Sequence, residues 1–188
     1  MKKYFNPRQG FTLVEMMVAT SLFIIVVTIS MGAILSIFEA NRKAQASKTV
    51  MDNLNLALED MARTVRFGTN HHCENTGTLS QPRNCSNNVS GSNFLAVNFK
   101  GQTIVYRRSG NTIQRSNNGG ASYTDITSPQ NIVIESLTFR VFGTSQSDYF
   151  QPYVLVVIKG YSGNPNRPSK STFSIQTIMS QRKLDIQL

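Results

Sequence analysis

The side chains best suited to chemistry in this sequence of 188 residues are His71, His72, Cys73 and Cys85. Together they could bind zinc, but adjacent histidines point in different directions in most backbones, and the paired ligand spacing typical of zinc sites is absent. Cys73 and Cys85 could instead form a disulfide that closes a surface loop and stabilises the fold by about 3 kcal/mol, or they could remain free thiols. We predict the disulfide and keep the other two as alternatives.

The carboxylates show no pattern typical of an active site. The sequence contains no Gly-x-Ser-x-Gly, no phosphate-binding glycine loop and no His-Glu-x-x-His. The acidic residues are dispersed, so paired-carboxylate catalysis has little support. Asp125 or Asp148 could bind calcium at a loop, but neither belongs to an acidic cluster. We therefore predict that the chain is not an enzyme and that it holds no catalytic residue, no metal and no cofactor.

One carboxylate, Glu15, lies in an unusual place. It is the only charged residue between Phe11 and Phe38, in a segment long enough to cross the hydrocarbon core of a membrane. A carboxylate in a membrane helix costs about 2.5–3.5 kcal/mol, so a chain that keeps one is expected to use it. A secretory signal peptide ending at Ala44-Gln45-Ala46 would have a shorter apolar core. A plain membrane anchor would leave Glu15 unexplained.

The basic residues predict the orientation of the membrane helix. Lys2, Lys3 and Arg8 precede the apolar segment, and basic residues favour the cytoplasmic side. The short N-terminus is therefore expected in the cytoplasm, with everything after Phe38 across the membrane. Cysteines in that outer compartment can persist as a disulfide.

The whole chain is basic, with a formal net charge of +9 and a pI of about 9.9. Most of its lysines and arginines are scattered, as on a solvated surface. Arg107, Arg108 and Arg115 are expected near one hairpin, and they leave nucleic-acid binding open as an alternative.

Beyond Phe38 the sequence becomes amphipathic. Small and apolar residues recur at steps of three and four, which predicts one face of a helix, and Gly68 is a typical residue after a helix end. Asp52, Glu59 and Asp60 are assigned to the exposed faces. We predict that residues 39–67 continue the membrane helix and pack on the chain's own sheet through Ala40, Ala44, Ser47, Met51, Leu54, Leu58, Met61 and Val65.

The remainder of the chain, residues 68–188, is predicted to form a β-rich head domain. Residues 69–91 are polar and are expected to form a loop, after which apolar and polar residues alternate as in antiparallel strands. A change of phase near Ser136 indicates a β-bulge. The predicted strands are 94–99, 102–108, 111–115, 132–142, 153–158 and 172–178. One long helix, membrane-spanning in its first half, packed on a mostly antiparallel sheet is an α+β fold.

The stretch Gln9-Gly10-Phe11-Thr12-Leu13-Val14-Glu15, between a short basic leader and a hydrophobic helix, resembles the prepilin leader of type IV pilins and type II secretion pseudopilins. The resemblance implies that residues 1–10 are a leader peptide, that prepilin peptidase cuts between Gly10 and Phe11, and that Phe11 becomes N-methylated. It also implies that Glu15 pairs with the Phe11 amine of a neighbouring subunit in a filament. Many major pilins carry a proline partway along this helix, where the present chain has Gly32.

Two later segments, Asn131–Phe139 and Phe173–Thr177, with Arg182 after them, are similar to minor pilins and J-type pseudopilins. The expectation is a structural subunit, a minor pilin or pseudopilin, of a type IV pilus-like or type II secretion filament. The alternative is a DNA-binding minor pilin of a DNA-uptake machine.

This resemblance also implies the partners and the location of the protein. The expected partners are prepilin peptidase, other pilin or pseudopilin subunits, assembly platform proteins and membrane lipid. The expected location is the cytoplasmic (inner) membrane, crossed once, with the head outside the cytoplasm. After assembly the protein would be in a filament, in the periplasm or at the cell surface.

Overall fold

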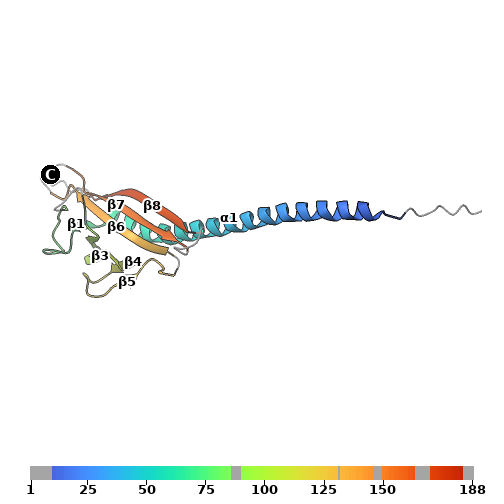
Figure 1. Ribbon diagram of the computed structural model, residues 1–188. Helices are drawn as coiled ribbons and strands as arrows, with labels where there is room; N and C mark the ends of the chain where they lie inside the picture. Colours follow the sequence, from blue (N-terminus) through green and yellow to red (C-terminus); the bar gives the residue numbers. More distant parts are fainter. Residues whose placement is uncertain (1–9, 86–89, 131, 146–149, 164–169, 184–188) are drawn as a thin grey trace, which may run out of the picture. The chain divides into compact units, whose positions relative to one another are not determined.

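The computed structural model describes residues 10–85, 90–130, 132–145, 150–163 and 170–183. The chain divides into two compact units, of which the first ends at Arg42 and the second begins at Lys43. We describe each unit by itself and call the second one the head. The elements are labelled in Figure 1. In chain order they are α1 (Leu13–Phe67), β1 (Thr69–Cys73), β2 (Phe94–Phe99), β3 (Gln102–Ser109), β4 (Thr112–Ser116), β5 (Thr124–Asp125), β6 (Ile132–Phe142), β7 (Tyr153–Ser162) and β8 (Ser171–Ser180).

Two antiparallel sheets form the β-structure of the head. One has the strand order β1-β2-β3-β4-β5 and the other the order β6-β7-β8. Figure 1 shows β6, β7 and β8 running alongside the part of α1 that belongs to the head. The predicted α+β fold, one long helix with a mostly antiparallel sheet domain, is confirmed. The predicted bulge is present between Ile134 and Ser136.

One hydrophobic core joins the head part of α1 to both sheets. The helix contributes Val50, Leu54, Ala57, Met61 and Val65, each no more than 2% exposed. Full burial of a large apolar side chain contributes about 1.5–3 kcal/mol, so this core holds the helix on the strands. Its buried strand residues are Cys73, Leu95, Val97, Ile104, Tyr106, Ile113, Ile132, Ile134, Leu137, Phe139, Val141, Val154, Val156, Ile158 and Met179.

The buried face of α1 differs in part from the predicted stripe. Leu54, Met61 and Val65 are buried as predicted, but Met51 is 53% exposed. Residues next to the predicted stripe are buried instead. Strands from two sheets contact the helix, and together they cover a different part of the helix surface from the one that the stripe predicted. These additional buried residues are Val50, Ala57 and Thr64.

The loop predicted for residues 69–91 is wrong at its start. Residues 69–73 form β1, which pairs with β2, and His71, His72 and Cys73 are buried. The strand was missed because its sequence, Thr-Asn-His-His-Cys, lacks the alternating apolar residues by which a strand is recognised. Its pairing with β2 and its burial decide its conformation.

Three other strands also depart from the prediction. β5 was not predicted, since two residues are too few to show a period. β7 extends to Ser162 and β8 spans Ser171–Ser180, so both are longer than predicted. The predicted loop after β7 lies mostly in residues 164–169, outside the described residues.

A polar network ties α1 to β3 and β4 inside the head. The buried Tyr106 hydroxyl donates to Asp60 Oδ2 at 2.6 Å and lies 2.9 Å from Thr64 Oγ1. Arg115 Nη1 is 3.1 Å from Asp60 Oδ1. The assignment of Asp60 to an exposed face is therefore wrong, because its carboxylate accepts from two strand residues. The network opposes rotation of the helix about its axis.

The buried Tyr106 phenol gives a first prediction, on how the stability of the head changes at alkaline pH. Burial, followed by the hydrogen bond to Asp60, raises the pKa of Tyr106 above its usual range. An unfolded chain releases this proton near pH 10, so the stability that depends on the protonated phenol is complete below that pH. We expect the free energy of unfolding to fall as pH rises above about 10.

The measurement is denaturant unfolding of the full chain in detergent micelles, between about pH 8 and about pH 11. Tyr106→Phe should lose about 1–2 kcal/mol at the lower pH and should lack this part of the alkaline decline. Tyr161→Phe, at a half-buried ring beside Lys170, is the control and should keep it. An equally steep decline in Tyr106→Phe would contradict the assignment.

Candidate processing and assembly site

In the described part of the first unit three residues precede the helix, and the third of them caps it. The Glu15 N–H donates to Thr12 Oγ1 at 3.2 Å, and the Met16 N–H donates to Thr12 O at 3.2 Å. Thr12 is therefore the N-cap, and Glu15 is the third helical residue, where the acid of a capping box stands. The Glu15 charge also lies near the positive end of the helix dipole. Glu15 thus has a favourable local place at the helix start.

Gly10 and Phe11 lie before the helix and are accessible. α1 begins at Leu13, two residues later than predicted. The Phe11 side chain is 79% exposed, and a Cβ added at Gly10 would meet no atom within 4 Å. The described part of the chain therefore has no steric need for glycine at position 10.

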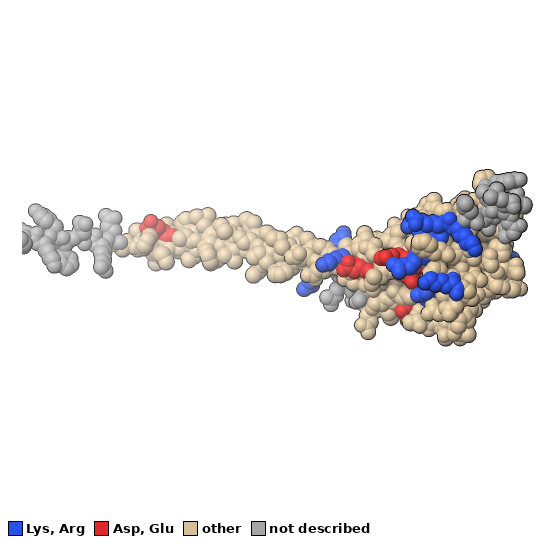
Figure 2. Space-filling model, turned by 180° about the vertical axis from the view of Figure 1, so that it is seen from behind, with Lys and Arg blue, Asp and Glu red and all other residues tan. Residues whose placement is uncertain are grey.

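The surface of the first unit is almost entirely apolar. α1 contains one stretch that is long and apolar enough to cross a membrane, and none of that stretch is buried inside the protein. On the face shown in Figure 2 a single acidic group interrupts the uncharged surface of this unit before its basic end. Contacts within the described part of the chain leave these side chains exposed, so lipid or other protein must cover them.

Four hydroxyl groups in this apolar stretch bond to the helix itself. An unbonded hydroxyl is costly in lipid, where no water can replace the missing partner. Each of these hydroxyls donates to a backbone carbonyl three or four residues earlier, at 2.8–3.0 Å; they belong to Thr20, Ser21, Thr28 and Ser30. These four side chains are thus compatible with an apolar environment.

Glu15 has no basic residue near it on its own helix. The next basic residue toward the C-terminus is Arg42, which is 27 positions away, or about 40 Å along a helix. The leader residues Lys2, Lys3 and Arg8 lie outside the described residues. Among the described residues of this unit none before Arg42 can supply an opposite charge, so it must come from the residues before Gly10 or from another molecule.

An exposed apolar helix near the N-terminus and an antiparallel head fit a membrane-anchored α+β protein. Residues 5–31 match the family model described as the prokaryotic N-terminal methylation motif. This match supports membership of the type IV pilin and pseudopilin family, and it does not separate minor from major subunits. Neither the curated proteins nor the solved structures gave a match.

In the head, the predicted disulfide between Cys73 and Cys85 is present. Both sulfur atoms are used in this bond, so the structure contains neither the free thiols nor the zinc ligands of the two alternatives. His71 and His72 point to opposite faces of the sheet, as adjacent strand residues do. His71 Nε2 lies 3.0 Å from Val65 O, near the end of α1, where a donor is needed for a free helix carbonyl.

The described residues contain no set of ligands for the calcium ion considered as an alternative. Asp125 Oδ1 accepts from Thr112 Oγ1 at 2.9 Å and from Gln114 Nε2 at 3.0 Å. No group of three acidic, histidine or cysteine residues that could hold a metal occurs in the described ranges. Asp148 lies outside them.

The three arginines behind the nucleic-acid alternative do not form one basic patch. Arg107 lies over the Tyr123 ring at 3.5 Å and pairs across the strands with Gln114. Arg108 follows it on β3 and therefore faces the other side of the sheet, where its Nε donates to Ile134 O at 2.9 Å. Arg115 pairs with Asp60, as described above. These contacts are internal to the head. The three guanidinium groups are therefore poorly placed to bind the phosphate backbone of a nucleic acid.

The capping role of Thr12 gives a second prediction. Thr12→Val removes the acceptor for the Glu15 N–H while it keeps the side-chain shape, so the first turn should fray, at a cost of about 1 kcal/mol. Hydrogen exchange of the full chain in micelles should show a protection factor at the Glu15 amide about fivefold lower.

Thr20→Val is the matched control, since the Thr20 hydroxyl only donates, to Met16 O and Met17 O. It should leave protection at Glu15 unchanged. Equal protection in Thr12→Val and the wild type would show that Thr12 is not the cap.

Proposed function

We propose that this chain is a structural subunit, a minor pilin or pseudopilin, of a type IV pilus-like or type II secretion filament. Prepilin peptidase cuts between Gly10 and Phe11, the new Phe11 amine is methylated, and the helix then assembles with those of other subunits. The observation that carries the proposal is an exposed, uncharged helix surface with one carboxylate, Glu15, inside the stretch that matches the methylation motif.

The physics of assembly follows from this surface. In the membrane the apolar side chains contact lipid, and in a filament they contact other helices, so the chain moves between two apolar environments at small cost. Cleavage creates a positive amine at Phe11. Pairing of that amine with Glu15 of a neighbour offsets the cost of both charges in an apolar bundle. Because the pair forms at only one axial offset of two helices, it sets their register.

The N-cap at Thr12 also determines where the Glu15 carboxylate and the Phe11 amine lie on one subunit. The cap fixes Glu15 in the first helical turn, while Phe11 remains outside the helix. The carboxylate and the amine of one subunit are therefore displayed at the same end of the helix. The proposal places this end in the membrane, with the head outside the cytoplasm, and with platform proteins and lipid as further partners.

The proposal does not extend to DNA capture. The arginines that suggested it are bonded within the head, and Arg107 faces away from the other two. The structural role also leaves the chain without an enzymatic activity.

Processing gives the third prediction, tested by the intact mass of the protein isolated from the membranes of its own cell. We expect the loss of residues 1–10 and the gain of one methyl group on Phe11. Gly10→Val should block both changes, because a β-branched residue would crowd the scissile bond, whereas the described fold would accommodate it. A full-length, unmethylated wild-type chain would sink the proposal.

Register setting gives the fourth prediction. Glu15→Ala should insert in the membrane normally and reach the filament at least about tenfold less, since an unpaired buried amine costs several kcal/mol. Glu15→Gln tests whether the charge rather than the shape is needed, and it should fail in the same way.

Glu39→Gln is the control, because Glu39 is an exposed acid on the same helix outside the apolar stretch. It should assemble normally. The measurement is the ratio of subunit in sheared filaments to subunit in membranes, by immunoblot. Wild-type ratios for both Glu15 variants would refute the register role.

A further inference from the structure

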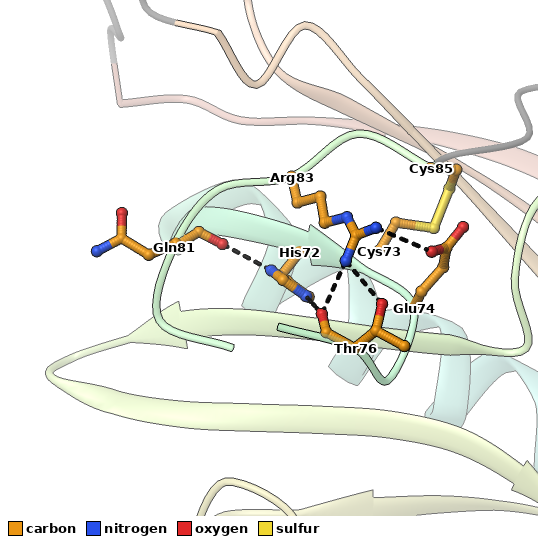
Figure 3. Close-up of polar contacts among 7 residues, drawn as sticks. All are labelled: His72, Cys73, Glu74, Thr76, Gln81, Arg83 and Cys85. Carbon is orange, nitrogen blue, oxygen red and sulfur yellow. Dashed lines mark hydrogen bonds and ion pairs between the residues drawn. A yellow bond between two sulfur atoms is a disulfide. The ribbon is translucent and has the colours of Figure 1, made fainter. Parts of the chain in front are cut away.

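The loop between the two cysteines closes around the ring of His72. Residues 74–84 leave β1 and return so that Arg83 pairs with the backbone of β1. Figure 3 shows the His72 ring between two backbone carbonyls of this loop. His72 Nδ1 is 2.7 Å from Gln81 O, and His72 Nε2 is 2.8 Å from Thr76 O. The His72 residue is only 1% exposed, so no water competes for either nitrogen.

The chemistry of these two contacts constrains the protonation of His72. A backbone carbonyl oxygen accepts hydrogen bonds and cannot donate one. A neutral imidazole carries one N–H, so it can bond only one of the two oxygens and would direct a lone pair at the other. Both contacts are hydrogen bonds only if both nitrogens carry protons, that is, if His72 is the imidazolium.

The charged groups around the ring are few. Arg83 Nη1 donates to Thr76 O at 2.9 Å, so the same carbonyl is contacted by the Arg83 guanidinium and by the His72 ring. Arg83 Nη2 lies 3.5 Å from Glu74 Oε2, so a carboxylate accompanies these two side chains. On this face of the sheet β2 and β3 carry Phe94, Ala96, Val105 and Arg107, and the Arg107 guanidinium lies over the Tyr123 ring at 3.5 Å. His71 is on the opposite face, at Val65 O.

The backbone of this region is strained. Asn70 and Glu74 have φ values of 53° and 74°, in the left-handed region that costs a non-glycine residue about 1 kcal/mol or more. They lie on either side of the buried His71-His72-Cys73 segment. The hydrogen bonds of His72 and Arg83 hold the loop against this strain, in addition to the disulfide.

We propose that His72 is a pH-sensitive latch on the disulfide-closed loop of residues 74–84. As the imidazolium it bonds both Thr76 O and Gln81 O and holds the loop closed. Loss of one proton at higher pH leaves one carbonyl facing a lone pair, and the loop loosens while the disulfide keeps its two ends in place. Both bonds exist only while both ring nitrogens carry a proton, so the loop is held through both carbonyls only in that state.

The latch acts on a surface feature of the head. Gln81 and Arg83 line a polar pocket of about 610 Å³, together with Asn70, Asn84 and Thr144. Release of Gln81 O would move one wall of this pocket. The inference does not rest on the proposed function, because it depends only on contacts within the head.

The test is nuclear magnetic resonance of the full chain in micelles, with labelled histidine, between about pH 5 and about pH 8.5. The chain has only two histidines, and His72→Gln assigns the spectrum. We expect both ring nitrogens of His72 to be protonated at the low end and one at the high end. Over the same range, protection factors of the loop amides at residues 77–81 should fall by about tenfold, as the loss of one charged hydrogen bond implies.

Two results would overturn the latch: a singly protonated His72 ring at the low end, or loop protection that does not follow the proton. His72→Gln should make loop protection low and independent of pH, whereas His71→Gln, altered on the opposite face, should keep the pH dependence. If a variant fails to fold, the wild-type ring and amide measurements still decide the question.

Discussion

The structure depends on the isolation of one charge, the Glu15 carboxylate, on a helix surface that is otherwise apolar and exposed. No basic residue of the same helix can reach it before Arg42. Other features of the described helix suit an apolar environment, since four hydroxyl groups bond to the helix backbone and Thr12 satisfies an N–H at the helix start. A chain built this way is stable in lipid or among helices, and it lacks only a cation for Glu15.

The head meets a different constraint, because the same helix there supplies part of a protein core. Val50, Leu54 and Met61 pack on two sheets, and Asp60 accepts from Tyr106 and Arg115. The sequence changes character accordingly, from apolar between Phe11 and Phe38, with Glu15 as the one charged residue, to amphipathic after Phe38. The conformation of the helix end is closely determined as well: a Cβ at Gly68 would lie 2.3 Å from Val97 Cγ1 and 2.5 Å from Thr64 O. The strands thus pack against the backbone where α1 ends.

Periodicity in the sequence was enough to predict α1, its end at Phe67, most strands and the bulge near Ser136, since each leaves a repeating pattern. It failed at β1, where polar residues are buried for reasons of pairing, and at Asp60, whose partners are distant in sequence. The predicted buried face of the helix was wrong at Met51. Which side of the helix is buried depends on where the two sheets pack, and the helix sequence alone does not show this. At the N-terminus, Thr12 and Glu15 carry the spacing of a capping box, so that local role was readable but overlooked. The double carbonyl contact of His72 could not be predicted, because it depends on the path of the loop.

The central claim, that Glu15 is an assembly contact, is tested most directly by zero-length carbodiimide coupling in filaments from the protein's own cell, followed by mass spectrometry. The account predicts an amide bond between the Glu15 carboxylate and the N-terminal nitrogen of another processed subunit, which forms only when the two groups are in contact. Cross-links between lysines and carboxylates on the head surface show that the reagent has worked. If they form while Glu15 is recovered uncoupled, or coupled to a lysine, the account is contradicted.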